Sequence, residues 1–164
     1  MNKEVRNKIK QLCDEITFEP DWTTKIWLDV LDISCSDKLI DSLPEKLRTV
    51  FLLANLKNTI SCDGFLSVFY NESLYEIKRL RRAIELSGSQ ELGNLFDEAF
   101  QLVKSKFTWL NKIMNFIGQT SDDPYEFFGN KITDRIEEIE TKISDIIYED
   151  DFEKHLEAYM KSQP

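Results

Sequence analysis

Residues 131–147, KITDRIEEIETKISDII, carry the clearest periodicity in this chain of 164 residues. Isoleucines stand at positions 132, 136, 139, 143 and 146, so their spacing alternates between four and three residues. This spacing places them along one side of an α-helix, as in the a and d positions of a heptad repeat. We expect the stripe to pack against the rest of the same domain, because two heptads are short for an independent coiled coil. A seam between two copies of the chain is the alternative.

Most of the remaining chain shows the same helical periodicity. Apolar residues recur at intervals of three and four, and only five Gly and four Pro interrupt them. We therefore predict one compact all-α domain of about seven to nine helices. Its parts are N-terminal helices over 1–42, a helical core over 43–118 and acidic C-terminal helices over 119–164. Besides the isoleucine segment and a short segment near 39–43, the expected helices cover about residues 5–18, 22–33, 44–62, 65–70, 74–86, 90–107, 109–117 and 151–161.

Negative charge is concentrated near the C-terminal end. Residues 121–153 hold twelve Asp or Glu and three Lys or Arg, which gives this segment a net charge of −9. The whole chain also has a net charge of −9, so acidic and basic residues are equal in number outside the segment. An acidic surface gathered in one place attracts a basic partner and steers its approach. The spacing puts several carboxylates opposite the isoleucines. The predicted partner-binding residues are Asp134, Glu137, Glu138, Asp145, Glu149, Asp150 and Asp151.

No catalytic, cofactor or metal motif accompanies this charge. The one histidine, His155, is expected at the surface or at the edge of the core, and Cys62 has no basic residue near it in sequence that would activate a thiol. The acidic run at 149–153 lacks the turn glycine of an EF-hand loop, so we interpret it as a solvated helix start. We expect a protein that is not an enzyme and needs no cofactor.

The sequence also indicates the cellular location of the protein and the state of its cysteines. The chain starts without an apolar leader and contains no run of eighteen apolar residues, so we expect a cytoplasmic protein that does not engage membranes. Its three cysteines, Cys13, Cys35 and Cys62, have no metal-site or disulfide spacing and are expected to be reduced and mostly buried.

The sequence contains one basic cluster, which consists of Lys78, Arg79, Arg81 and Arg82. The net charge of −9 repels nucleic acid, and the cluster has no aromatic platform nearby, so we expect no direct nucleic-acid binding. These side chains are expected to form salt bridges with Glu76 or Glu85, or to dock the acidic segment.

Three stretches resemble one bacterial family. They are LPEKLR at 43–48, DGFLSVFYN at 63–71 and AIELSG at 83–88, and the acidic IYEDD at 147–151 and LEAYM at 156–160 follow in the expected order. Together they are similar to the DNA-mimic-protein-like family over about residues 43–163. Ser67 stands where the family usually has glutamine, and Asp63 with Gly64 stands where it has a glycine pair. The motif positions retained are Gly64, Phe65, Phe69, Tyr70 and Asn71, and together with Asp63 they form either part of the core or a pocket.

The resemblance implies an all-helical protein that binds another protein through carboxylates placed like DNA phosphates. A helix over 130–153 would be about 36 Å long, and a duplex of that length carries about 21 phosphates. The segment holds nine acidic and three basic residues. One copy would therefore imitate part of a single strand, and a homodimer that joins two such faces would imitate a duplex better.

Three functions remain open at this point. The first is a partner-binding protein that covers the basic surface of a DNA-binding protein or of a toxin. The second is a ligand-binding protein or enzyme with a pocket near residues 63–71 that uses Asp63, Tyr70 and Asn71. The third is a structural subunit whose acidic surface only confers solubility.

Overall fold

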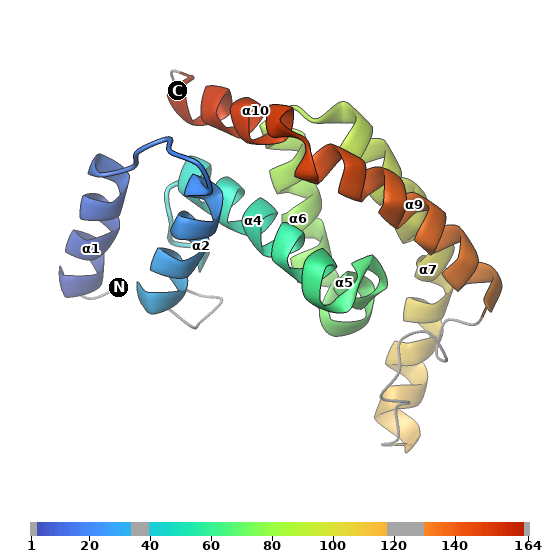
Figure 1. Cartoon of the computed structure of the whole chain (residues 1–164). Helices are drawn as coiled ribbons and strands as arrows, with labels where there is room; N and C mark the ends of the chain where they lie inside the picture. The colour runs from blue at the N-terminus through green and yellow to red at the C-terminus, as the bar shows by residue number, and fades with distance from the viewer. Residues whose placement is uncertain (1–2, 34–39, 118–129, 163–164) are drawn as a thin grey trace.

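Eight helices form the part of the chain that the structure, a computed structural model, describes: residues 3–33, 40–117 and 130–162 (Figure 1). In chain order they are α1 (Lys3–Asp14), α2 (Trp22–Ile33), α4 (Glu45–Asp63), α5 (Phe65–Asn71), α6 (Leu74–Ser87), α7 (Gln90–Ile117), α9 (Asn130–Tyr148) and α10 (Asp150–Lys161). These residues contain no strand, and they confirm the expected single all-α domain.

Helix α4 lies at the centre of the structure. A helix with apolar side chains around most of its circumference must be covered on most sides. Helices α2, α5, α6, α9 and α10 all pack against it. Its buried side chains are Leu47, Thr49, Val50, Phe51, Leu52, Leu53, Ala54, Leu56 and Ile60.

The family motif forms the sharp junction between α4 and α5. Gly64 ends α4 with φ +78°, a conformation that an L side chain rarely adopts. Phe65 and Phe69 are fully buried, with ring centroids 5.2 Å apart, and Phe69 also lies 5.4 Å from Phe96 of α7. Tyr70 is half-buried against the same core. Gly64, Phe65 and Phe69 therefore have a structural role, because Gly64 forms the turn between the two helices and the phenylalanines fill the core.

The start of α5 is capped by a residue from a distant helix. Gly64 has no side chain to accept the first free N–H groups, and the backbone N–H of Phe65 donates to Glu140 Oε2 of α9 at 2.8 Å. A carboxylate at this position also opposes the positive end of the helix dipole. One acidic residue of α9 thus has a structural task inside the molecule.

The isoleucine stripe of α9 packs within the domain, as predicted. Ile136, Ile139 and Ile143 are buried, and Ile132 and Ile146 are partly buried. The last fully covered position is Ile147 rather than Ile146. The stripe contacts α7, α5 and α4, so its central residues are not accessible to a second copy of the chain.

Two helix boundaries differ from the sequence-based expectation. Helix α1 ends at Asp14 rather than near Phe18, because the chain turns so that the Phe18 ring packs edge-on against Trp22 at 4.9 Å. Helix α7 is continuous, although two helices were predicted over 90–117, since no Gly or Pro separates them. The predicted loop at 120–124 and Cys35 lie outside the described residues.

An exposed cluster around Asp41 fastens the segment before α4 to α6. Tyr75 donates a hydrogen bond to Asp41 Oδ2 at 2.8 Å, and Arg79 pairs with Asp41 Oδ1 at 3.2 Å. Arg48 donates to the backbone carbonyl of Asp41 at 2.9 Å. The hydrogen bond from Tyr75, followed by the contacts with Arg79, lowers the pKa of Asp41 below its ordinary value.

The Glu140 cap can be tested by substitution. We expect Glu140→Ala to lower the free energy of unfolding by about 1 kcal/mol, because the loss of an N-cap acceptor typically costs that much. Chemical denaturation followed by circular dichroism measures the change. Glu137→Ala, on the exposed side of the same helix, should change it by less than about 0.5 kcal/mol. Equal stability of the two variants would remove the capping role from Glu140.

The Asp41 cluster predicts a pH effect with a defined sign. Because folding lowers the pKa of Asp41, its stabilising contribution is present above the unfolded-state pKa and is lost as pH falls through the folded-state pKa. Tyr75→Phe removes the main cause, so the pKa of Asp41 should rise toward its ordinary value. A carboxyl-carbon NMR titration measures this pKa. Tyr148→Phe, which removes a hydroxyl group elsewhere, should leave it unchanged, and an unchanged value in Tyr75→Phe would contradict the assignment.

Candidate functional site: an acidic face and a pocket

The predicted partner-binding carboxylates lie at the surface of α9 and at the start of α10. We call this set the acidic face; its described members are Asp134, Glu137, Glu138, Asp145, Glu149 and Asp151, all exposed. The side chain of Asp150 lies outside the described residues. In Figure 1, α9 and α10 follow one another along one edge of the molecule.

The acidic face is only lightly engaged by neighbouring cations. Arg135 forms an ion pair with Glu138 and also donates to Glu98 of α7 at 3.0 Å, and Lys154 contacts Asp151 at 3.0 Å. The contacts with Glu98, then those with Glu138, raise the pKa of Arg135. Within the described residues, the carboxylates of the other four members make no hydrogen bond or ion pair. Exposed ion pairs contribute little to stability, so a partner can replace them at low cost.

Not all acidic residues of the segment face solvent. Glu140 caps α5, as described above, and Glu153 accepts hydrogen bonds from Thr23 of α2 at 2.8 Å and from Lys57 of α4 at 3.2 Å. These two carboxylates hold α9 and α10 against the core. The charge available to a partner is therefore smaller than the sequence count suggests.

The acidic segment also bends, which corrects the estimate of one helix over 130–153. Glu149 has an extended backbone, with φ −69° and ψ 141°, and separates α9 from α10. The 19 residues of α9 span about 28 Å at 1.5 Å per residue. The acidic face consequently has two short arms rather than one straight row of charges.

The basic cluster of α6 makes local ion pairs. Arg82 pairs with Glu85 at 3.0 Å, as predicted. Arg81 makes two hydrogen bonds with Asp97 of α7, at 2.7 and 2.8 Å, and Arg79 pairs with Asp41. The hydrogen bonds with Asp97 raise the pKa of Arg81. The pairs of Arg79 and Arg81 join α6 to its neighbours, the pair of Arg82 lies within α6, and none of these pairs involves the acidic face.

The histidine and the two described cysteines differ in their surroundings. His155 Nε2 hydrogen-bonds with the backbone carbonyl of Ser87, at the edge of the core where it was expected. Cys13 is half-buried, and its burial, followed by the charge of Asp14, raises the pKa of its thiol. Cys62 is exposed, so the expectation of mostly buried thiols is wrong for this residue, which stands on the outer side of the last turn of α4.

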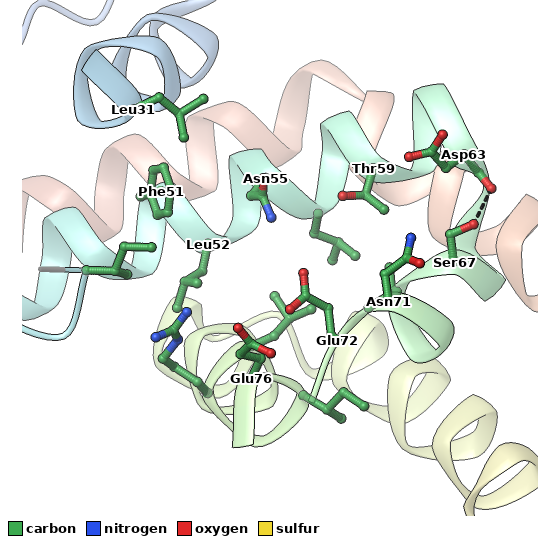
Figure 2. Close-up of a pocket in the computed structure, with 16 residues that line it drawn as sticks. Leu31, Phe51, Leu52, Asn55, Thr59, Asp63, Ser67, Asn71, Glu72 and Glu76 are labelled. Atoms are coloured by element: carbon green, nitrogen blue, oxygen red, sulfur yellow. Dashed lines mark hydrogen bonds between the residues drawn. The ribbon is translucent and has the colours of Figure 1, made fainter. Parts of the chain in front are cut away.

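A pocket of about 240 Å³ lies between α4, α5 and α6 and is bordered by Leu31 of α2 (Figure 2). Asp63 and Asn71 line it, as expected for a pocket near 63–71, whereas Tyr70 does not. Ser67 also lines it, and its hydroxyl donates to the Asp63 carbonyl at 2.6 Å. Most of the wall comes from α4 and α6.

The polar groups of the pocket come from both walls. Figure 2 shows Asn55 and Thr59 of α4 facing Glu72 and Glu76 across the open space. Asn55 Oδ1 accepts a hydrogen bond from Trp27 Nε1 at 3.0 Å, which leaves the amide NH₂ group directed into the pocket. The sequence contains a signal for two of these residues, since Asn55 and Thr59 are polar residues at i and i+4 and so lie on the same side of α4.

One glutamate of the pocket, Glu76, also caps α6. Glu76 and Ser73 form a capping box at the start of α6, in which the Ser73 N–H donates to Glu76 Oε2 at 2.7 Å. Partial burial raises the pKa of Glu76, but hydrogen bonds with Ser73 and Glu72 and the charge of Arg79 outweigh it, so the pKa is lowered. Figure 2 shows Glu72 and Glu76 on the same side of the pocket.

Among the described residues, no three His, Cys, Asp or Glu side chains are arranged to hold a metal ion. None of the described helices combines the length and the apolar character that crossing a membrane requires.

Comparison with known proteins agrees with the family motif. No curated protein and no solved structure matches the chain. A family description, DMP19-like protein, matches residues 41–163 and thus includes everything from the segment before α4 to the end of α10. It confirms the resemblance drawn from the residues around Gly64 and leaves α1 and α2 outside the match. Because the match covers well over half of its length, the chain belongs to the DMP19-like protein family.

Proposed function

We propose that the protein is a non-enzymatic interaction protein whose acidic face occupies the basic surface of a DNA-binding protein. The observation that carries this proposal is a row of exposed carboxylates on a helix whose opposite side is fixed in the core. Membership of the DMP19-like family supports it, because the resemblance to DNA-mimic proteins implies binding of this kind.

The spacing of the carboxylates supports imitation of a single phosphate strand. Asp134, Glu138 and Asp145 lie on one side of α9, and at 1.5 Å per residue they are about 6 and 10 Å apart along the helix axis. Phosphates of one DNA strand follow at about 3.4 Å along the duplex axis. One copy therefore presents a sparse, partial substitute for one strand, and its second arm on α10 extends it in a new direction.

Pre-organisation also favours the proposal. Ile136, Ile139 and Ile143 are each at most 1% exposed, so α9 cannot rotate without exposing them. The hydrogen bond from Phe65 to Glu140 fixes the same helix from its side. A surface already held in its bound shape spends less free energy on ordering when a partner binds.

A pull-down from the host lysate tests the acidic face directly. The face variant carries Asp134→Asn, Glu138→Gln, Asp145→Asn and Glu149→Gln. A matched control variant carries Asp14→Asn, Glu15→Gln, Asp32→Asn and Glu91→Gln, which removes the same charge from exposed positions elsewhere. Wild type and control should retain a basic DNA-binding protein, identified by mass spectrometry, and the face variant should lose it.

Salt and DNA provide the second criterion. Exposed charges are screened over about 8 Å at physiological ionic strength, so capture should weaken as salt is raised. A short DNA duplex should displace the captured protein, because the acidic face and DNA would compete for one basic surface. Equal capture by all three proteins, or capture that neither salt nor duplex reduces, would refute the proposal.

A further inference from the structure

The pocket between α4 and α6 is separate from the acidic face. None of the acidic-face residues lines it. Packed protein interiors contain few voids larger than a water molecule, and about 240 Å³ is far larger than that. The space is sized for a small organic molecule, below the usual range for drug-sized ligands.

Hydrocarbon forms much of the pocket wall. Phe51, Leu52 and Leu56 contribute from α4, and Ile77 and Leu80 contribute from α6. All five are buried, with at most 8% exposure, so they are held in place by the core around them. Such a wall favours a ligand with an apolar body over a fully hydrated ion.

The charged groups of the pocket are mainly negative. Asp63, Glu72 and Glu76 bring three carboxylates, and Arg79 brings one guanidinium group that already pairs with Asp41. The resulting field repels carboxylate and phosphate ligands and attracts cations. Glu72 and Glu76 both line the pocket and lie on the same side of it in Figure 2, so one positive group placed there can contact both.

We propose that this pocket binds a small organic cation, with an ammonium group between Glu72 and Glu76 and an apolar chain against Phe51, Leu56 and Leu80. The NH₂ group of Asn55 and the hydroxyl group of Thr59 would hydrogen-bond to a polar substituent on the ligand. An ammonium group needs only hydrogen-bond acceptors and one or two carboxylates, whereas a metal ion needs a fuller ligand shell.

Isothermal titration calorimetry with three matched probes tests the charge requirement at pH 7. The probes are n-hexylamine, n-hexanol and n-hexanoate, which share a six-carbon chain and differ in the end group. We expect saturable binding of hexylamine, at least tenfold weaker binding of hexanol and no binding of hexanoate. A thermal-shift measurement should show stabilisation by hexylamine in the same order.

Three variants locate the binding site. Glu72→Gln should weaken hexylamine binding at least tenfold, whereas Glu85→Gln, on the outer side of α6, should bind as wild type does. Thr59→Leu fills the pocket and should abolish binding, with helix content and denaturation midpoint recorded to show that it folds. The proposal is overturned if hexylamine does not bind, if the three probes bind alike, or if Glu72→Gln or Thr59→Leu binds as tightly as wild type. These measurements involve no protein partner, so their outcome is independent of the acidic-face experiment.

Discussion

The burial of α4 is the constraint on which the rest of the structure depends. This helix has apolar side chains on most of its circumference, and five other helices cover it. Its C-terminal end must also turn sharply, and Gly64 provides that turn so that Phe65 and Phe69 enter the core. The pocket exists where this cover is incomplete and where polar side chains of α4 face α6. Core and pocket thus have a common origin in one central helix.

The acidic face depends on the same core through α9. Isoleucines hold one side of this helix inside the domain, so the carboxylates on the other side have fixed positions. Glu140 and Glu153 show that negative charge serves two purposes here. Each accepts hydrogen bonds from a neighbouring helix, whereas the acidic-face residues remain exposed to solvent. An acidic composition alone does not distinguish these two groups, because the distinction depends on which helices lie beside each residue.

Local features could be predicted from the sequence, and non-local ones could not. The helical periods, the turn at Gly64 and the internal packing of the isoleucines all follow from short-range spacing. The end of α1 was misjudged because Phe18 leaves the helical stripe to pack against Trp22, a tertiary contact. The cap that Glu140 provides for α5 and the hydrogen bond between Trp27 and Asn55 each join residues far apart in sequence. Only the fold brings these residues together. A pocket near 63–71 was expected, but its opposing wall on α6 required the packing of α4 against α6.

The contacts of α2 have a consequence for what counts as the folding unit. The family match begins at residue 41, yet Trp22, Ile26 and Val30 of α2 are buried, and Thr23 and Trp27 hydrogen-bond to α10 and α4. The start of the family match and the start of the packed core therefore fall at different places in this chain. The helix α2, which precedes the match, is integrated into the core, so a change in α2 acts on the stability of the matched part and not only on its surface.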